Sequence, residues 1–298
     1  MKILTLNSHS LEEADYEEKL KAFVEGICRE KPDVIALQEV NQTRTARGVD
    51  AGLLEVSGYI PCESGADCTE TVIREDNHGY RVAGMLEERG LSYSWTCVSA
   101  KLGYGKYDEG LALLCRFPVL DSRQCFITGS HDYQNWKTRK ILGILAETER
   151  GPEWFYSVHM GWWKDDDEPF EKQWSRISSL LKTDGEKPIW LMGDFNSPSN
   201  ISGEGYDMIR WSGWLDTYEL AVQKDDGITV DHSIDGWKDK RKEPGMRIDY
   251  IWTSEKMPVK SSRVIFNGKD HPVVSDHFGV LAECGEACMR ERPHGNEE

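Results

Sequence analysis

The sequence predicts an α/β fold of the α+β kind, in which two packed sheets of mixed, largely antiparallel strands are flanked by helices. The first observation is an opening strand followed by an amphipathic helix. The second is a series of strand-like segments at residues 111–117, 141–148 and 154–159, some separated by too few residues for a crossover helix. Such strands pair antiparallel, which argues against a purely parallel, doubly wound sheet.

The first third of the chain alternates between strand-like and helical patterns. Residues 3–6 are expected to form a strand, and residues 34–37 a second strand that ends at Gln38-Glu39. A polar loop follows, and residues 52–79 show the weak periodicity of an insertion or a substrate-facing loop. The helix between the two strands is indicated by apolar residues on one face, at Leu20, Phe23, Val24, Ile27 and Cys28.

The remaining elements continue this mixture of helices and strands. A helix is expected to end near Gly90, another to precede a buried strand that begins at residue 189, and residues 248–253 and 278–282 to form the last two strands. The two helices are indicated by Tyr80, Ala83, Met85 and Leu86, and by Trp174, Ile177, Leu180 and Leu181. Without a repeat or an interdomain linker, residues 1–286 are expected to form one domain, followed by a polar tail over residues 287–298.

Charge and composition narrow the class of protein. The chain has 36 Lys and Arg against 52 Asp and Glu, a net charge of −16 that repels polyanions and argues against nucleic acid as a partner. A small anionic ligand held by metal ions is still compatible with this net charge, since bound divalent ions dominate the local electrostatic field. No signal peptide or membrane-spanning apolar run is visible, so we expect a cytoplasmic protein without a membrane partner.

Polar side chains stand at the ends of many of the expected strands. An apolar run ends at Gly193 and is followed by Asp194 and Asn196, which project to the same side if extended. An Asx turn alone would explain this pair. The pattern recurs at Asn7, Glu39, Glu109, His159, Asp249, Asp276 and His277. So many polar groups at the rim of a sheet predict a shared functional site, because none has an individual structural need.

The types of these side chains suit one kind of chemistry. Taken singly, they could be a turn former, surface carboxylates or a satisfied core histidine. Together they supply hard oxygen ligands for Mg²⁺ or Mn²⁺, two imidazoles, and carboxylates that can orient those imidazoles. A carboxylate beside an imidazole fixes its tautomer and stabilises its protonated form.

The motifs, taken in order, resemble those of the endonuclease/exonuclease/phosphatase superfamily, which has the deoxyribonuclease-I-like fold. The matching segments are Leu6-Asn7, Leu37-Gln38-Glu39-Val40, Glu109-Gly110 with Arg116-Phe117-Pro118, Val158-His159, Gly193-Asp194-Phe195-Asn196, Arg247-Ile248-Asp249-Tyr250-Ile251 and Ser275-Asp276-His277. Each motif is weak alone, but the ordered set is specific and extends over nearly the whole chain. The resemblance implies a four-layered α/β sandwich and Mg²⁺-dependent phosphoester hydrolysis.

Carried over by position, the resemblance implies a role for each matching residue. Glu39 corresponds to the main metal ligand, with Asn7 and Asp276 beside it. Asp194 corresponds to the residue that orients or deprotonates the attacking water, and Asn196 to its partner in holding the phosphate.

Two histidine–carboxylate pairs are also implied by the resemblance, His277 with Asp249 and His159 with Glu109. His9 departs from the family's pattern, since nuclease branches carry an aspartate at this position. We therefore expect His9 to contact the substrate instead of supporting a second metal ion.

Three local features bear on which phosphoester is cleaved. The acidic charge disfavours a long nucleic-acid track. Residues 135–140 contain three cations, among them Arg139, which are enough to hold one phosphate dianion. Trp162 and Trp163 follow His159, and indole rings stack well on the apolar faces of sugars, although stacking on bases and an ordinary core role are competing uses.

Residues 106–112, 135–140 and 159–163 resemble most closely the bacterial maltose 6′-phosphate phosphatases. This resemblance implies a cytoplasmic enzyme that removes phosphate from a disaccharide phosphate after uptake by a phosphotransferase system. The expected substrate contacts are His9, Tyr107, Arg139, Trp162 and Trp163. The alternative is a metal-dependent endonuclease or exonuclease, or another phosphodiesterase. An inactive binding protein would have lost ligand residues, whereas all of them are present here.

Overall fold

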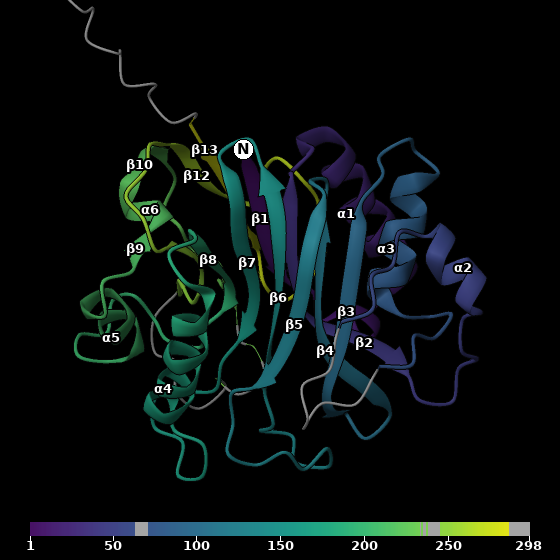
Figure 1. Ribbon diagram of the computed structural model, residues 1–298, viewed down its shortest axis with the longest axis horizontal. Coiled ribbons are helices and arrows are strands. Elements are labelled where there is room, and N and C mark those ends of the chain that lie inside the picture. The colour runs from purple at the N-terminus through teal and green to yellow at the C-terminus, as the bar shows by residue number, and fades with distance from the viewer. Residues whose placement is uncertain (63–70, 233, 235–236, 238–244, 286–298) are drawn as a thin grey trace, which may run out of the picture.

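Two β-sheets pack face to face, and helices cover their outer faces (Figure 1). The computed structural model describes residues 1–62, 71–232, 234, 237 and 245–285. The expected polar tail, residues 287–298, lies outside the described residues. Among those residues, no helix combines the length and the apolar character needed to cross a membrane.

The first sheet has seven strands in the order β10-β12-β13-β1-β2-β4-β3. Their bounds are β1 (Lys2–Asn7), β2 (Val34–Thr43), β3 (Ser94–Gly103), β4 (Tyr107–Cys115), β10 (Ala221–Lys224), β12 (Val259–Ile265) and β13 (Gly279–Cys284). The sheet is mixed, since β1 pairs parallel with β2 and antiparallel with β13. The antiparallel pair β2–β4 and the antiparallel hairpin β3–β4 complete one side of it.

The second sheet has six strands in the order β5-β6-β7-β8-β11-β9. Their bounds are β5 (Val119–Phe126), β6 (Lys140–Thr148), β7 (Gly151–His159), β8 (Ile189–Asp194), β9 (Leu215–Asp216) and β11 (Asp249–Thr253). It is also mixed, because β7 pairs parallel with β8 while the other pairs are antiparallel. The expectation of two mixed, largely antiparallel sheets is confirmed.

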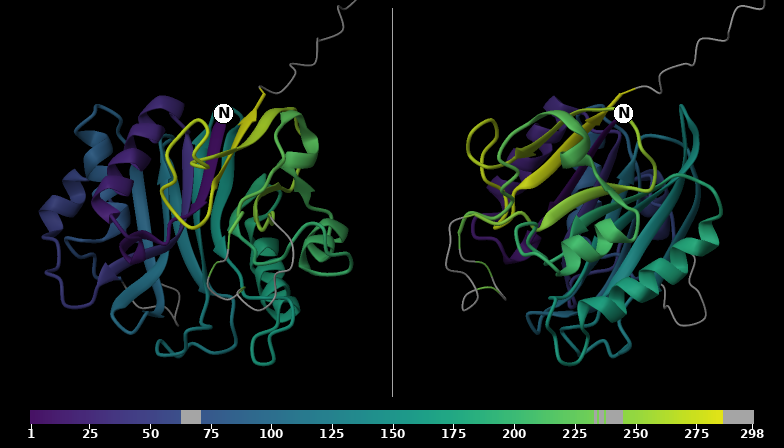
Figure 2. Two further views of the ribbon diagram at one scale, coloured as in Figure 1. Left: turned by 180° about the vertical axis from the view of Figure 1, so that it is seen from behind. Right: turned by 90° about the vertical axis from the view of Figure 1, so that its left-hand side faces the viewer.

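Helices from different parts of the chain form the two outer layers, on opposite sides of the molecule (Figure 2). The 3₁₀ turn η1 (Ser10–Glu12) and helices α1 (Tyr16–Glu30), α2 (Ala51–Val56) and α3 (His78–Glu87) lie on the side of the first sheet. The second side has α4 (Phe170–Leu181), η2 (Lys182–Asp184) and α5 (Gly205–Trp211), and α6 (Thr217–Leu220) precedes β10.

Three apolar layers hold the sandwich together. The central layer, between the sheets, contains Phe155, Trp190 and Met192 together with Ile3 and Val34. A second layer lies between the first sheet and helices α1 and α3, and a third between the second sheet and helices α4 and α5. Each sheet therefore buries both faces, which is why its central strands read as nearly continuous apolar runs.

The helices α1, α3 and α4 occur where the apolar periodicity indicated them. Gly90 has a φ of +73° just beyond α3, as expected of a residue that closes a helix. Strands β3, β5, β9, β10 and β12 were not predicted. Residues 248–253 and 278–282 do contain the strands β11 and β13, as expected, but these are not the last two strands, because β12 lies between them in the chain.

Gly193 in β8 is required by its neighbours. Its φ is +152°, and a Cβ atom there would lie 1.9 Å from the carbonyl oxygen of Val158 on β7. We expect Gly193→Ala to lower the free energy of unfolding by roughly 2 to 6 kcal/mol, the sum of backbone strain and overpacking. Urea unfolding measures this change. The matched control is Gly84→Ala in α3, where a Cβ meets no atom within 4 Å and stability should rise slightly; equal effects of the two substitutions would contradict the explanation.

Candidate active site

Strand register brings the expected site residues to one edge of the sandwich. In the second sheet, His159 of β7 lies opposite Asp194 of β8, and Asp194 lies opposite Asp249 of β11. In the first sheet, Asn7 ends β1 opposite Gln38 of β2. The Asn7 side-chain nitrogen donates to Asp194 Oδ2 at 3.2 Å, which joins the two sheets at this edge.

Glu39 lies at a β-bulge inside β2, so the expectation that the strand ends there is wrong. The strand continues to Thr43, its register against β4 shifts between Gln38 and Val40, and the φ of Glu39 is 50°. A bulge removes one residue from the ladder and redirects its side chain. The Glu39 carboxylate consequently lines the pocket, and its Oε1 accepts a hydrogen bond from Asn7 Nδ2 at 3.0 Å.

Asp194 is the central carboxylate of the site. Its Oδ1 accepts a hydrogen bond from the backbone N–H of Asn196 at 2.8 Å, and its Oδ2 lies 3.6 Å from His159 Nε2 and 3.9 Å from His277 Nε2. Burial, reinforced by the charge of Asp249, raises the pKa of Asp194 to about 7. A carboxylate with a pKa near neutrality can accept a proton from water and release it again.

The expected pair of His277 with Asp249 is confirmed. His277 Nδ1 and Asp249 Oδ2 are 2.9 Å apart, and both side chains are buried. Burial opposes the charge on the ring, but Asp249 and then Asp194 outweigh it and raise the pKa of His277 well above its ordinary value. His277 is therefore a cation that points Nε2 toward the pocket.

The expected pair of His159 with Glu109 is wrong. Glu109 Oε1 lies 2.9 Å from Lys101 Nζ, and no hydrogen bond or ion pair joins Glu109 to His159 in the described part of the chain. Burial lowers the pKa of His159 well below its ordinary value, and the cations Arg139, Lys101 and His277 lower it further. His159 is a neutral imidazole beside Asp194, unlike the cationic His277.

A pocket of about 320 Å³ opens over these groups, a volume at the low end of the range for small-molecule sites. Glu39, Glu109, Asp194 and Asp276 line it with carboxylates. Lys101 and Arg139 join His277 as its cations, and Tyr104, Trp136 and Trp162 supply aromatic rings. The described parts of residues 52–79, expected to be an insertion or a substrate-facing loop, do not line the pocket.

These carboxylates suit a divalent cation. Burial, followed by the negative charges of Glu109 and Asp276, raises the pKa of Glu39. The carboxylates thus repel one another, and a divalent cation bound between their oxygen atoms would remove that repulsion. That Glu39 and Asp276, with the side-chain oxygen of Asn7, would hold it stays a prediction.

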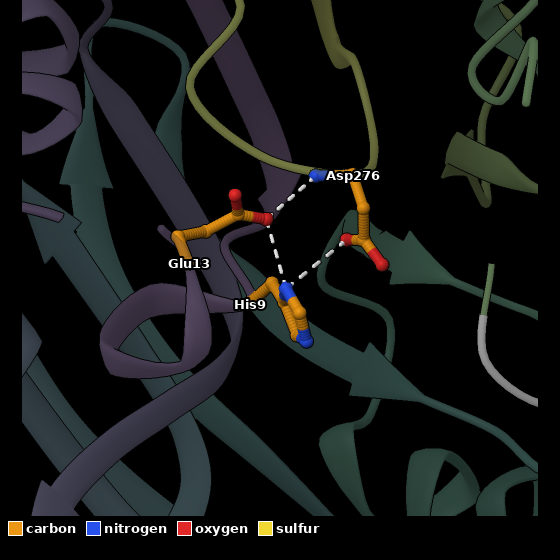
Figure 3. A group of neighbouring side chains, drawn as sticks. All are labelled: His9, Glu13 and Asp276. Atoms are coloured by element: carbon orange, nitrogen blue, oxygen red, sulfur yellow. Dashed lines mark hydrogen bonds and ion pairs between the residues drawn. The ribbon is translucent and has the colours of Figure 1, made fainter. Parts of the chain in front are cut away.

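His9 lies beside Asp276 but is not among the residues that line the pocket. Its Nδ1 is 2.8 Å from Glu13 Oε1 and 3.9 Å from Asp276 Oδ1, and the same Glu13 oxygen accepts the backbone N–H of Asp276 (Figure 3). Burial opposes the charge of His9, but Glu13 and Asp276 outweigh it and raise its pKa to about 9. Its Nε2 lies 3.1 Å from the hydroxyl of Tyr104, which does line the pocket.

Besides His9, two more of the expected substrate contacts, Tyr107 and Trp163, are not among the residues that line the pocket. Tyr107 is buried, and its hydroxyl donates to the carbonyl oxygen of Leu11 at 3.0 Å. Trp163 packs against the third apolar layer, with its ring 5.8 Å from that of Phe170. Trp162 lines the pocket as expected, and its partner is Trp136, whose ring centre is 5.7 Å away.

The three cations of residues 135–140 do not act together. Lys137 Nζ lies 3.0 Å from Asp165 and 2.7 Å from Asp167, and Lys140 Nζ donates to Gln124 Oε1 at 2.9 Å. Arg139 alone among the three lines the pocket. A cation-rich segment therefore contributes one positive charge to the site.

Several residues of the site were not predicted. Trp237 Nε1 donates to Asn196 Oδ1 at 3.0 Å, while the Asn196 amide donates to the carbonyl oxygen of Met160 at 2.9 Å, so that the Asn196 side chain is held from both ends. Lys101 lies on β3, a strand absent from the prediction. Trp136 belongs to a segment that was singled out for its cations alone.

The buried Asp194 and the partly buried Glu39 and Asp276 lie beside one protonated and one neutral imidazole, an arrangement that suits a hydrolase. Residues 4–277 match the Endonuclease/Exonuclease/phosphatase family, and the chain belongs to it. Members of this family are hydrolases. No curated protein matches the chain significantly.

Several solved structures resemble this one over nearly its whole length. An endonuclease/exonuclease/phosphatase family protein from Leptotrichia buccalis C-1013-b is 32% identical, with a TM-score of 0.82 over 96% of this chain and 100% of that one. A mannosyl-6-phosphatase from Bacteroides thetaiotaomicron VPI-5482 is 16% identical, with a TM-score of 0.65 over 96% and 100% of the two chains. Truncated TDP2 from Caenorhabditis elegans is 16% identical, with a TM-score of 0.57 over 96% and 97%. The last two show the fold alone.

A divalent cation should stabilise the folded protein through the Glu39 carboxylate. Mg²⁺ at about 100 times its dissociation constant should raise the melting temperature of chelator-treated protein by roughly 5 °C, because binding to the folded state adds about 2.7 kcal/mol. Glu39→Gln should abolish this shift. The control is Glu87→Gln on the exposed end of α3, which should keep it; a full shift in the Glu39 variant would refute the assignment.

Proposed function

We propose that this protein is a Mg²⁺-dependent phosphoric monoester hydrolase that acts on a sugar phosphate, with maltose 6′-phosphate as the expected substrate. The observation that carries the proposal is the composition of the pocket. The pocket is lined by carboxylates together with the cations His277 and Arg139, and the neighbouring rings of Trp136 and Trp162 also line it. These charged groups suit a phosphate, and the indole rings suit the apolar face of a sugar.

Several of the polar residues that line the pocket have distinct roles in the proposed reaction. Asp194, with a pKa of about 7, accepts a proton from the water that attacks phosphorus in line with the leaving sugar oxygen. The cationic His277 stabilises negative charge on the phosphate oxygens, and Asn196 holds the phosphate in place. The neutral His159 donates a hydrogen bond to the leaving sugar oxygen, which takes its proton from solvent water as it departs.

Mg²⁺, held by Glu39, Asp276 and Asn7, would supply charge neutralisation on the phosphate. Mn²⁺ suits the same oxygen ligands and could replace it. The structural relative described as a mannosyl-6-phosphatase supports a phosphorylated sugar as the substrate class. A sugar phosphorylated during uptake is met inside the cell, so we place the enzyme in the cytoplasm.

Phosphodiester hydrolysis, as by a nuclease, is the alternative. Bases can stack on Trp136 and Trp162 as sugars can. The net charge of −16 disfavours a nucleic-acid strand, because binding to such a strand depends on replacing its counterions with protein cations.

A panel of substrates separates the two activities. In Mg²⁺ buffer we expect chelator-sensitive phosphate release from maltose 6′-phosphate, measured against trehalose 6-phosphate, glucose 6-phosphate and an oligonucleotide scored for strand cleavage. Asp194→Asn should lower kcat by roughly 10² to 10⁴-fold, the usual contribution of a general base. Strand cleavage without release of phosphate from any monoester would replace the proposal with the nuclease alternative.

Arg139 should bind the phosphate of the substrate. Arg139→Met should raise KM by roughly 10 to 100-fold, because it removes charge-assisted hydrogen bonds to the phosphate. Lys137→Met is the matched control: Lys137 lies in the same segment but pairs with Asp165 and Asp167, so its loss should leave KM within about twofold. Equal effects of the two substitutions in steady-state kinetics would remove Arg139 from the site.

A further inference from the structure

Arg139 is a buried cation whose charge is not paired. Its Nη1 donates to the carbonyl oxygens of Trp136 at 2.8 Å and Thr138 at 3.3 Å, while its Nε has no hydrogen-bond partner. Within the described ranges, no carboxylate forms an ion pair with it. Burying a guanidinium without a counter-ion costs free energy, which the binding of an anion offsets. The unpaired charge and the unused Nε therefore both indicate a site for an anionic ligand.

Glu109 is the protein carboxylate best placed to occupy that site. Burial lowers the pKa of the Arg139 guanidinium, and the carboxylate of Glu109, ahead of those of Glu39 and Asp194, opposes this shift. Glu109 also lines the same pocket. A carboxylate that reached the guanidinium would form a charge-assisted pair with it and exclude a phosphate.

Lys101 holds Glu109 in another position. The two residues face each other across the β3–β4 pair, just after a register shift between Ser99 and Lys101. Lys101 Nζ is 2.9 Å from Glu109 Oε1, and the two side chains are 10% and 5% exposed. On the other side, a Cβ atom at Gly103 would lie 2.4 Å from Glu109 Oε2, so this glycine leaves room for the carboxylate. The Glu109 carboxylate is thereby fixed between Lys101 and the β3–β4 turn.

We propose that Lys101 is a positioning residue that keeps Glu109 away from Arg139, and so keeps the guanidinium free to bind the phosphate dianion of the substrate. This inference rests on the proposed function and deepens it, since it assigns the free charge that recognises phosphate and the residue that preserves it. Lys101 acts through Glu109 and needs no contact with the substrate.

A role for Lys101 in restraining Glu109 predicts one result that other roles of Lys101 do not predict. If Lys101 bound phosphate itself, removing Glu109 as well would not restore the phosphate affinity lost with Lys101. If Lys101 served stability alone, its loss would lower the melting temperature of the phosphate-free protein and leave KM unchanged. If Lys101 restrains Glu109, the second substitution repairs the first. A double-mutant cycle separates these cases.

The experiment measures affinity for inorganic phosphate by the rise in melting temperature, and KM and kcat for p-nitrophenyl phosphate, both in Mg²⁺ buffer. In Lys101→Met we expect phosphate affinity to fall and KM to rise by roughly tenfold or more, because Glu109 then pairs with Arg139. In Lys101→Met/Glu109→Gln both should return to within about threefold of the wild type, since neither charge of the buried pair remains. Adding Arg139→Met to the double variant should abolish the recovery.

The outcomes are distinct. A double variant as weak as Lys101→Met overturns the inference. If Lys101→Met does not fold, Glu109→Gln alone decides: phosphate affinity equal to or above that of the wild type supports the inference, and a tenfold loss overturns it. If the wild-type protein hydrolyses the monoester but the second substitution does not rescue Lys101→Met, only this inference is overturned. A wild-type protein that neither binds phosphate nor releases it from a monoester overturns this inference and the proposed function together.

Discussion

The site depends on the contact between the two sheets at one edge of the sandwich. Gln38 of the first sheet donates to Ser157 Oγ of the second at 3.0 Å, and Ser157 Oγ donates back to the carbonyl oxygen of Leu37 at 2.9 Å. These buried bonds must stay satisfied, so they fix how the sheets lie relative to each other. The carboxylate of Glu39, from one sheet, and that of Asp194, from the other, meet for this reason.

Burial and charge give chemically similar groups different states in this confined space. His277 is a cation because Asp249 is bonded to it, whereas His159 is neutral because it is buried near cations. Asp194 has a pKa of about 7, and the pKa of Glu39 is raised by burial and then by its carboxylate neighbours. Separating the pKa values of like groups is how a site obtains both proton acceptors and fixed charges at one pH. The guanidinium of Arg139, which has no ion-pair partner among the described residues, is another fixed charge of this site.

The sequence predicted the strands that are buried on both faces and missed those nearer to the edges. The missed strands β3, β5, β9 and β10 are the outermost strands of the two sheets, and the missed strand β12 neighbours β10. β5 and β12 have charged residues such as Arg123 and Lys260 among their apolar ones, as strands near an edge often do, so their pattern reads as a loop. The bulge at Glu39 was missed for another reason, since a single displaced residue leaves no periodic signal.

The sequence by itself determined which chemical groups stand at the strand ends, because a polar residue that closes an apolar run is visible in one dimension. Asn7, Asp194, Asp249 and His277 could be read in this way. Only the tertiary structure decided which groups meet. Lys101 took the place of His159 beside Glu109 through the pairing of β3 with β4, and Trp136, not Trp163, faces Trp162. Such contacts join segments distant in sequence, so their geometry follows from strand pairing and sheet packing, neither of which local composition encodes.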